Sequence, residues 1–562
     1  MSNRERAERW LAQDPDPVTQ AELGLILESG DEEALESRFG ATLEFGTAGL
    51  RGELGAGSNR MNRVTVMRAA AGVGHRLLAD GPEGSHAVVI GYDARNGSAQ
   101  FAVDTAAVLS GMGISSWLLP RILPTPVLAY AVRHLSANAG VMVTASHNPP
   151  RDNGYKVYWG DGAQIVPPVD KEISDAIAAV GPVNELRRGV PPGQARAEGE
   201  SSWKVLGDEI VQAYLQAIQH IPFGVDRAVR VAYTPMHGVG GALLIRAFME
   251  NGFAPPLTVP EQSLPDPEFP TVAFPNPEEP GAMDLVLALA SQVEADVAIA
   301  NDPDADRCAV AVPLPEGGWR MLTGDEVGGL LAEHVLRHTT GEDRLVATTI
   351  VSSSLLGRIA EAHGVNFAET LTGFKWIMKA GWPTHRLVFG YEEALGYSLG
   401  GQKGVPVKDK DGVSAALAVA ALTAEAKRAG RTLLDLLDDQ ASRFGVHATA
   451  QVSVRVTDKA LIDDAMTALR EGPPVQLGGR AVERIDDLSE GLNGLPPTEG
   501  VRLALAGGAR VVIRPSGTEP KLKAYLEVVV PVEADDVPAA RAAAADALTL
   551  LKNDLAALLP AG

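Results

Sequence analysis

A serine and a histidine follow directly after an apolar segment that reads as a β-strand. The segment begins at Gly140, and Ser146, His147 and Asn148 come at its end in the stretch TASHNPP. A serine hydroxyl acts as a nucleophile when a neighbouring base activates it or when a metal ion holds its electrophile. Glycine does not flank Ser146 at the spacing of a serine-hydrolase elbow. Phosphoryl chemistry is therefore the chemical alternative to a simple turn rich in Ser, Asn and Pro.

Three aspartates, Asp302, Asp304 and Asp306, alternate along the stretch DPDADR after another apolar segment. Their carboxylates could converge on one hard divalent cation, and oxygen ligands favour Mg²⁺. The glycine and the later glutamate of a calcium-binding EF-hand loop are not in place. Such a cation also draws electrons from a bound phosphoryl group, whose transfer depends mostly on position and charge. The alternative is an acidic turn without a ligand.

Two further stretches offer groups that suit a phosphorylated sugar. In GYEEALGY, after a third apolar run, Glu392 supplies a carboxylate that can accept hydrogen bonds from sugar hydroxyls. In RPSGTEP, the guanidinium of Arg514 and the hydroxyls of Ser516 and Thr518 surround Gly517 and could cradle a phosphate. An acidic loop and an ordinary glycine turn are the respective alternatives.

Lysines between these stretches add positive charge. Lys156 lies in NGYK, Lys375 in LTGFKW and Lys410 in KDKDG. A lone lysine is more often a solvated surface residue, so the value of each depends on its neighbours.

The elements that must position these residues resemble a parallel α/β arrangement. Six β-type runs, HAVVIGYD, GVMVTASH, VRVAYTP, ADVAIAND, RLVATTIVS and HRLVFGYE, alternate with helical patterns and end in or beside polar residues. Ligands of open α/β sheets bind beyond the carboxyl ends of the strands. The sequence therefore places Ser146, the three aspartates and Glu392 where a binding site belongs.

The length of 562 residues predicts several domains. Residues 1–40 read as a polar, partly amphipathic helical extension, and composition changes predict domains at 41–215, 216–322, 323–445 and 446–562. The segment LPEGGWRMLTGDE reads as a hairpin turn that leads into a new helix near the third boundary. The last segment, with TAQVSVRV, ARVVIRP, KAYLEVVV and an Ala-rich helix, reads as α+β.

Charge and cysteine usage limit the classes of partner. The formal net charge of −22 opposes binding to nucleic acid or to an anionic membrane, although a local basic cluster can still hold an anionic substrate. The single cysteine, Cys308, cannot form an internal disulfide and fits a reducing compartment. The first thirty residues carry no apolar signal region, and no stretch approaches the length of a membrane span. We therefore expect a cytoplasmic protein.

With these stretches in this order, the sequence resembles the α-D-phosphohexomutase superfamily over nearly its whole length. TASHNP resembles the phosphoserine loop of that family, DPDADR its metal loop, GYEEALG its sugar loop and RPSGTEP its phosphate loop. The stretch FGTAGLRG resembles the family's opening loop, with Thr47 and Arg51. The resemblance implies a four-domain phosphohexomutase architecture: three doubly wound α/β domains and a smaller C-terminal α+β domain around a central cleft.

The resemblance also implies roles for individual residues. Ser146 would carry a phosphoryl group and would bind Mg²⁺ together with Asp302, Asp304 and Asp306. Proton transfer and charge stabilisation would involve His147, Lys156 and Lys410. The implied substrate-binding residues are Thr47, Arg51, Arg307, Gly373, Lys375, Glu392, Ala394, Arg514, Ser516, Gly517 and Thr518.

The expected reaction converts hexose 1-phosphate into hexose 6-phosphate, with glucose or mannose as the sugar, through a bisphosphorylated intermediate. Glucose 1,6-bisphosphate, or an equivalent sugar bisphosphate, would be the activator, and the protein would be a monomer or a small homo-oligomer. Ala394 departs from the Glu-Glu-Ser of many glucose-type members, which together with the N-terminal extension resembles the branch that contains phosphopentomutases and hexose-bisphosphate synthases. A phosphopentomutase is therefore the main alternative; a sugar-phosphate phosphatase and a non-catalytic sugar-phosphate sensor are weaker ones.

Overall fold

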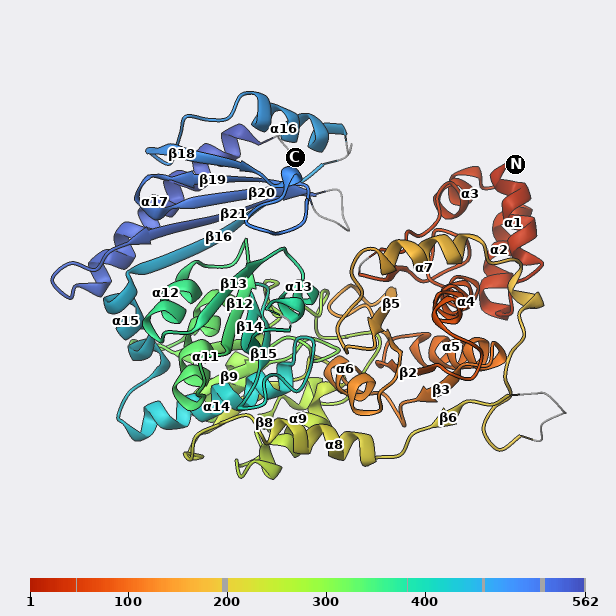
Figure 1. Ribbon diagram of the computed structural model, residues 1–562, viewed down its shortest axis with the longest axis horizontal. Helices are drawn as coiled ribbons and strands as arrows, with labels where there is room; N and C mark the ends of the chain where they lie inside the picture. Colours follow the sequence, from red (N-terminus) through yellow and green to blue (C-terminus); the bar gives the residue numbers. More distant parts are fainter. Residues whose placement is uncertain (47, 195–200, 382, 457–459, 516–520, 560–562) are drawn as a thin grey trace. The chain divides into compact units, whose positions relative to one another are not determined.

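A computed structural model describes the chain apart from residues 47, 195–200, 382, 457–459, 516–520 and 560–562 (Figure 1). By internal contacts the chain forms two compact units. The first unit comprises Met1–Phe223, Arg227–Met321 and Val405–Ala420, and the second comprises Gly224–Asp226, Leu322–Gly404 and Ala421–Gly562. The chain passes between the units several times, and one passage lies inside helix α14 (Gly412–Arg428).

Three short helices form the N-terminal extension: α1 (Asn3–Leu11), α2 (Pro17–Ser29) and α3 (Glu32–Phe39). Each begins at a residue whose side chain accepts a hydrogen bond from the first turn, namely Ser2, Asp16 and Asp31. Their apolar side chains, among them Trp10 and Phe39, join one core cluster with residues of helix α4 (Arg63–Asp80). The extension is therefore packed against the first α/β domain.

The first sheet has six strands in the order β1-β5-β4-β2-β3-β6. Strands β2, β3, β4 and β6 run parallel, whereas β5 is antiparallel to both β4 and β1. The elements are β1 (Leu50–Glu53), β2 (Ala87–Tyr92), α5 (Ser98–Gly111), β3 (Ser115–Leu118), α6 (Thr125–His134), β4 (Ala139–Val143), β5 (Asp152–Trp159), α7 (Val169–Ala178), the 3₁₀ turn Val183–Glu185 and β6 (Lys204–Val205).

The second sheet, also in the first unit, has the order β11-β10-β9-β7-β8. Parallel strands β8, β7 and β9 are followed by the antiparallel hairpin of β10 and β11, which confirms the hairpin turn predicted in LPEGGWRMLTGDE. The elements are α8 (Glu209–Ile218), β7 (Val231–Thr234), α9 (Gly240–Glu250), β8 (Leu257–Thr258), the 3₁₀ turn Pro260–Gln262, α10 (Asp284–Gln292), β9 (Val297–Ala300), β10 (Ala309–Pro313) and β11 (Trp319–Met321).

The third sheet lies in the second unit and has the order β13-β12-β14-β15. Strands β13, β12 and β14 are parallel, and β15 closes the sheet antiparallel to β14. The elements are α11 (Gly324–His338), β12 (Arg344–Thr349), α12 (Leu355–Ala362), β13 (Asn366–Thr370), α13 (Phe374–Lys379), β14 (Arg386–Glu392), β15 (Gly396–Leu399), α14 and α15 (Leu433–Phe444).

The last sheet is antiparallel throughout, in the order β16-β21-β20-β19-β18-β17. Helix α17 packs against β16 and β21, as Figure 1 shows. The elements are β16 (Val446–Arg455), α16 (Ala460–Glu471), β17 (Gln476–Leu477), β18 (Arg480–Asp487), the 3₁₀ turns Leu488–Glu490 and Ala506–Gly508, β19 (Val501–Leu505), β20 (Arg510–Pro515), β21 (Lys521–Val530) and α17 (Val537–Leu558). Three α/β domains and a final α+β domain confirm the predicted fold class.

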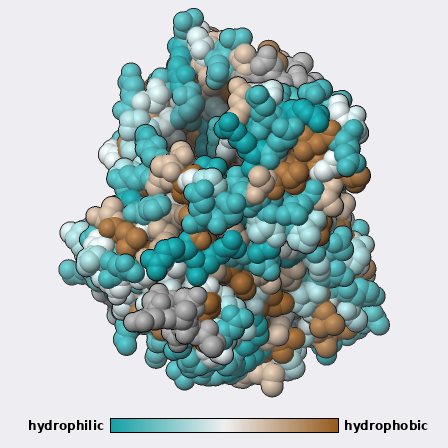
Figure 2. Space-filling view, turned by 90° about the vertical axis from the view of Figure 1, so that its right-hand side faces the viewer, coloured by the Kyte–Doolittle hydropathy of each residue, from teal (hydrophilic) through white to brown (hydrophobic). Residues whose placement is uncertain are grey.

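The face that Figure 2 shows is mostly hydrophilic, with apolar residues in small separate patches. Across the described part of the chain, no helix combines the length and the apolar character that a membrane span requires.

Candidate active site

The predicted nucleophile lies on the turn after β4 in a strained backbone conformation. Ser146 has φ of 50°, in the left-handed region that a residue with a Cβ rarely adopts. Its N–H donates to Oγ1 of Thr144 at 2.8 Å, and its hydroxyl lies 2.7 Å from Oδ2 of Asp302 and 3.2 Å from Nδ1 of His147. The turn thus aims the hydroxyl of Ser146 at the predicted metal loop.

A residue that the sequence did not single out holds this turn. The guanidinium of Arg95 donates to the backbone carbonyls of Ser146 (2.5 Å), Asn148 (2.6 Å) and Pro149 (2.8 Å). Its plane lies over the ring of Phe269 at 5.0 Å from the ring centre. Arg95 is 3% exposed, so these charge-assisted hydrogen bonds are shielded from water. The only sequence signal was an arginine two positions after the strand-end aspartate in GYDARN.

The three aspartates form one cluster. Asp302, Asp304 and Asp306 each place a carboxylate oxygen within 4.8 Å of the others, and all three side chains are buried. A left-handed residue between them, Ala305 with φ of 53°, turns the loop sharply enough for the carboxylates to converge. Among the residues that the structure describes, this is the one group of three ligand-type side chains that could hold a metal ion.

The hydrogen bonds of the aspartates leave room for a cation. Lys156 donates from Nζ to Oδ2 of Asp304 (2.7 Å) and Oδ2 of Asp306 (3.1 Å). The other oxygens, Oδ1 of Asp304 and Oδ1 of Asp306, are buried and have no hydrogen-bond partner within the described part of the chain. Unpaired buried carboxylate oxygens are costly, and a hard divalent cation would satisfy them. The donor set therefore fits a bound metal of the Mg²⁺ type.

The charges in this cluster are unevenly balanced. Burial raises the pKa of Asp302 well above its ordinary value, and the charges of Asp304 and Asp306 raise it further. Burial also raises the pKa of the other two carboxyls, but Lys156 outweighs it, and both pKa values lie below the ordinary range. Lys410, whose Nζ lies 3.3 Å from Oδ2 of Asp306, lowers the pKa of Asp306 further. Two carboxylates are thus compensated by lysines and the third is not.

The two lysines come from elements far apart in the chain. Lys156 lies in the middle of β5, whereas Lys410 lies in the loop before α14. Asp409, beside Lys410, accepts hydrogen bonds from the hydroxyl of Tyr158 (2.7 Å) and from Gln164 (2.9 Å), which fixes this loop against β5. A Cβ at Gly412 would lie 2.3 Å from the carbonyl oxygen of Arg307, so glycine permits the close approach of this loop to the metal loop.

Three further predicted residues join the same group. Arg51 donates to Oδ1 of Asn148 at 3.0 Å, which brings it to the turn that carries the nucleophile. The N–H of Arg307 donates to Oδ1 of Asp302 at 3.0 Å. Burial, followed by the positive charges of Arg307 and Arg51, lowers the pKa of His147 well below its ordinary value. The first unit therefore assembles nine of the predicted residues: Arg51, Ser146, His147, Lys156, Asp302, Asp304, Asp306, Arg307 and Lys410.

The second unit carries the predicted sugar loop. Glu392 is the last residue of β14, Ala394 lies in the turn to β15, and Leu395 turns the chain with φ of 62°. The neighbouring carboxylate, Oε2 of Glu393, accepts hydrogen bonds from the hydroxyls of Ser352 (2.9 Å) and Thr349 (3.3 Å). Burial, then the charges of Glu392 and Asp325, raises the pKa of Glu393 to about 7.

The remaining predicted residues of the second unit lie near its loops. Gly373, with φ of 113°, and Lys375 lie at the start of α13, and Arg514 lies near the end of β20. Burial raises the pKa of the phenol of Tyr525, the charge of Glu393 raises it further, and Arg514 lowers it. Thr47, Ser516, Gly517 and Thr518 lie outside the described residues.

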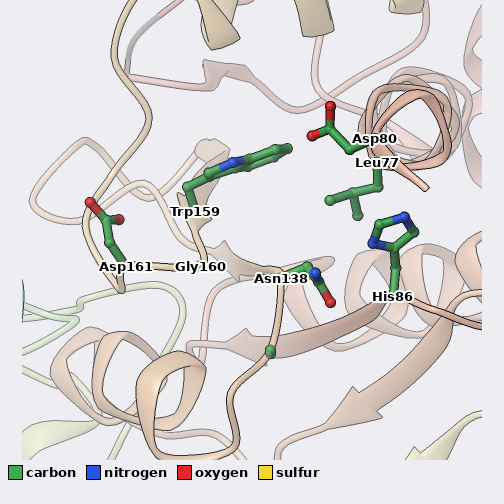
Figure 3. Close-up of a pocket in the computed structure, with 8 residues that line it drawn as sticks. Leu77, Asp80, His86, Asn138, Trp159, Gly160 and Asp161 are labelled. Atoms are coloured by element: carbon green, nitrogen blue, oxygen red, sulfur yellow. The ribbon is translucent and has the colours of Figure 1, made fainter.

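A cavity of about 230 Å³ lies elsewhere in the first domain. Figure 3 shows the indole of Trp159 and the imidazole of His86 bordering it, with Leu77 and Asp80 from the end of α4. None of the predicted site residues is among the residues that line it.

Comparison with protein families identifies four consecutive matches. They are the models described as phosphoglucomutase/phosphomannomutase, alpha/beta/alpha domains I, II and III, at residues 42–182, 212–316 and 323–444, and the C-terminal domain at residues 452–545.

Individual proteins agree with these matches. The chain is 43% identical over 473 residues to a protein of Haemophilus influenzae named probable phosphomannomutase, covering 83% of this chain and 93% of that protein. It is 35% identical to the phosphopentomutase of Mus musculus, covering 93% of this chain and 90% of that protein. Its fold matches the open form of parafusin, a phosphoglucomutase from Paramecium, with a TM-score of 0.68 at 20% identity, covering 92% of this chain and 96% of that one.

Proposed function

Because the chain belongs to the phosphoglucomutase/phosphomannomutase family and is a mutase, an isomerase that moves a phosphoryl group, we propose that it interconverts hexose 1-phosphate and hexose 6-phosphate, with glucose or mannose as the sugar. One observation carries the proposal: the hydroxyl of Ser146 lies 2.7 Å from Asp302, inside a buried cluster of three aspartates. A nucleophile beside a cation site is the arrangement that phosphoryl transfer requires.

In this proposal Ser146 carries the phosphoryl group at the start of each cycle. The bond between phosphorus and Oγ of Ser146 breaks while a bond to the free hydroxyl of the sugar phosphate forms, and the proton of that hydroxyl passes to a base. The product is a sugar bisphosphate, which then returns its other phosphoryl group to Ser146. The activator would be glucose 1,6-bisphosphate or an equivalent sugar bisphosphate, which can phosphorylate Ser146 in the unphosphorylated enzyme.

The residues around Ser146 divide the remaining tasks. Asp302, Asp304 and Asp306, with an oxygen of Ser146, would hold Mg²⁺. When bound, Mg²⁺ supplies positive charge that draws electron density from the transferring phosphoryl group. Lys156 is bonded to two carboxylates, and its pKa is raised despite burial because Asp304 and Asp306 stabilise its charge. It is therefore suited to charge stabilisation rather than to accepting a proton.

His147 and Lys410 are the candidates for proton transfer at the sugar hydroxyl. His147 lies 3.2 Å from the hydroxyl of Ser146, and Lys410 approaches from the loop before α14. We assign substrate binding to Arg51, Arg307, Gly373, Lys375, Glu392 and Arg514, and from the sequence alone to Thr47, Ser516, Gly517 and Thr518. Ala394 offers no hydroxyl to the sugar. The cytoplasmic location, the absence of nucleic-acid partners and a monomeric or small homo-oligomeric state remain predictions from the sequence.

The test compares glucose 1-phosphate, mannose 1-phosphate and ribose 1-phosphate as substrates, with Mg²⁺ and a trace of glucose 1,6-bisphosphate. We expect one of the two hexoses to have the highest kcat/KM. If ribose 1-phosphate exceeds both by more than about tenfold, the enzyme is a phosphopentomutase. That alternative is favoured by Ala394 and by the similarity to the mouse phosphopentomutase over 93% of this chain.

The same assay addresses the weaker alternatives. Release of inorganic phosphate in proportion to substrate consumed would indicate a phosphatase. Binding of sugar phosphates without conversion of any of them would indicate a sensor.

A further inference from the structure

Arg510, in the last domain, contacts the turn at residues 350–352 of the third domain, and this turn supports the sugar loop. Arg510, on β20, donates from one terminal nitrogen to the carbonyl oxygen of Ser352 and from the other to the carbonyl oxygen of Ile350 at 3.3 Å. Both carbonyls belong to the turn after β12, in the third domain. Arg510 is also paired with Glu369 of β13 (3.1 Å) and with Glu527 of β21 (2.6 Å). The side chain of Arg510 therefore joins the last two domains through hydrogen bonds to two backbone carbonyls and two carboxylates.

The turn that Arg510 holds is the support of Glu393. The hydroxyl of Ser352 donates to Oε2 of Glu393 at 2.9 Å and accepts from the N–H of Glu393 at 3.2 Å. It also lies 2.8 Å from the hydroxyl of Thr349, which stands 3.3 Å from the same carboxylate oxygen. Glu393 directly follows Glu392, the proposed sugar ligand, so the position of the sugar loop depends on Ser352.

The surroundings make this joint rigid. Ser352 is fully buried, and the side chain of Arg510 is 13% exposed. An apolar cluster surrounds the turn and joins the two domains; its buried members are Ile350, Val351, Leu371, Leu488, Val512 and Tyr525. Buried charge-assisted hydrogen bonds inside a packed apolar layer hold one geometry, because any shift leaves polar groups unpaired.

Strand β20 carries a second relevant arginine. Arg514, the proposed phosphate ligand, follows four positions after Arg510 on the same strand. Side chains four positions apart in a strand lie on the same face, about 13 Å apart along it. β20 therefore connects Arg510, which holds the turn under the sugar loop, to Arg514, the proposed ligand of the phosphate that is not reacting. The strand between them is hydrogen-bonded, so this distance is fixed.

We propose that Arg510 is a positioning residue that fixes the spacing between the sugar loop and Arg514, so that the enzyme discriminates sugar phosphates by the distance from ring hydroxyls to phosphate. This inference rests on the proposed function. One exocyclic carbon links ring and phosphate in both a hexose 6-phosphate and a pentose 5-phosphate, but the six-membered ring of the hexose gives a longer span from its far hydroxyls to the phosphate than the five-membered ring of the pentose. A fixed spacing accepts one of the two lengths, and errors of about 1 Å in position cost about 10²-fold in rate.

The test measures kcat and KM for glucose 1-phosphate and ribose 1-phosphate in the full-length enzyme and in Arg510→Met. We expect the ratio of the two kcat/KM values to fall at least about tenfold toward one, with KM raised for the preferred sugar. Arg502→Met is the matched control, because Arg502 pairs with the same Glu369 (2.8 Å) and with Asp486 (3.0 Å) but has no hydrogen bond to the 350–352 turn among the contacts of the described residues. Its ratio should remain near that of the wild type.

A second variant covers the case in which Arg510→Met does not fold. Ser352→Ala removes the hydroxyl between the turn and Glu393 and should reduce the same ratio. Ser353→Ala, whose hydroxyl bonds Glu527 at 2.6 Å, should not. If Arg510 acts through Ser352, the effects of Arg510→Met and Ser352→Ala on the ratio will not add in the double variant.

The outcomes separate this inference from the proposed function. A wild-type enzyme that converts none of glucose 1-phosphate, mannose 1-phosphate and ribose 1-phosphate would overturn the function and the inference together. An active wild-type enzyme with a ratio near one, or an unchanged ratio in both Arg510→Met and Ser352→Ala, would overturn the inference and leave the function standing.

Discussion

The hydroxyl oxygen of Ser146 lies 2.7 Å from Oδ2 of Asp302, although the two residues are 156 positions apart in the chain. The first comes from the end of β4 in the first sheet and the second from the end of β9 in the second sheet. Two separate α/β domains thus each supply one half of a nucleophile and metal centre. The following predictions address its parts.

Replacement of Ser146 by alanine should abolish turnover, because Ser146 is the one residue of the described part of the chain whose hydroxyl is hydrogen-bonded to Asp302. Intact mass after incubation with glucose 1,6-bisphosphate should show one added phosphate in the wild type and none in Ser146→Ala. Ser116→Ala is the control, since the hydroxyl of Ser116 donates to the nearby carbonyl oxygen of Ile114 at 3.1 Å. Phosphate on Ser146→Ala, or full activity of that variant, would contradict the mechanism.

Removal of divalent metal should inactivate the enzyme and lower its stability. Binding to the folded state stabilises it by mass action, and a cation relieves repulsion among three buried carboxylates. We expect Tm to rise with added Mg²⁺ in the wild type and to be insensitive to it in Asp304→Asn and Asp306→Asn. Asp325→Asn, a buried aspartate outside the cluster, should keep the response. An Mg²⁺-dependent Tm in both cluster variants would place the metal elsewhere.

Arg95→Met should reduce kcat by about 10²-fold or more with a smaller change in KM, because the change removes the hydrogen bonds from Arg95 to the carbonyls of Ser146, Asn148 and Pro149 and releases the left-handed backbone of Ser146. Thermal unfolding will show general destabilisation as well. Arg63→Met separates the two effects, since Arg63 pairs with Asp104 at 2.7 Å, away from this turn. Equal losses of kcat in both variants would mean that Arg95 acts only through stability.

The free energy of unfolding should decrease at acidic pH because Glu527 becomes protonated. Burial opposes its ionisation, but Arg510 and His447 outweigh burial and lower its pKa to about 2 from 4.5. Because the folded pKa lies below the unfolded one, this stabilisation is complete above pH 4.5 and is lost as the pH falls toward 2. The difference corresponds to about 3 kcal/mol. Urea unfolding of Glu527→Gln should show a flatter dependence between pH 5 and pH 2 than the wild type, and an unchanged slope would refute this assignment.

Glu393 should make the protein less stable as the pH rises, in a higher pH range than that of Glu527. Its folded pKa of about 7 lies above the ordinary 4.5, so the unfolded state loses its proton first. Stability should therefore decrease as the pH rises from 4.5 to 7 and level off above 7. In Glu393→Gln this decrease should be smaller, measured by urea unfolding at several pH values. If the free energy of unfolding changes by the same amount between pH 4.5 and pH 7 in the wild type and in Glu393→Gln, the effect is excluded.

Much of the fold was readable from the sequence because parallel strands are apolar throughout. All six runs predicted as strands are strands, namely β2, β4, β7, β9, β12 and β14. β5 was not predicted, although it carries Lys156, since DNGYKVYW begins with turn-type residues and lacks a continuous apolar run. An antiparallel strand beside a parallel one has no distinct pattern of apolar and polar residues by which the sequence would reveal it.

The centre of the site was predictable and its supports were not. Ser146 and the three aspartates follow apolar strands in short motifs whose residue types already indicate chemistry. Arg95 follows one stretch predicted as a strand and Arg510 lies in another, and their importance comes from backbone carbonyls that only the folded chain brings to them. Backbone acceptors leave no trace in residue types, so sequence reasoning could not find these two residues.

The segment Val405–Ala420 follows β15 along the chain, yet it packs with the first unit and delivers Lys410 to Asp306. Exchanging whole domains between relatives is a common way to transplant specificity. In this protein, a graft of the third domain with its ends at the domain boundaries in the sequence would also replace Lys410, the charged group beside Asp306. A chimera intended to alter the choice of sugar should therefore keep the recipient's own 405–420 segment, or chemical competence and selectivity will change together.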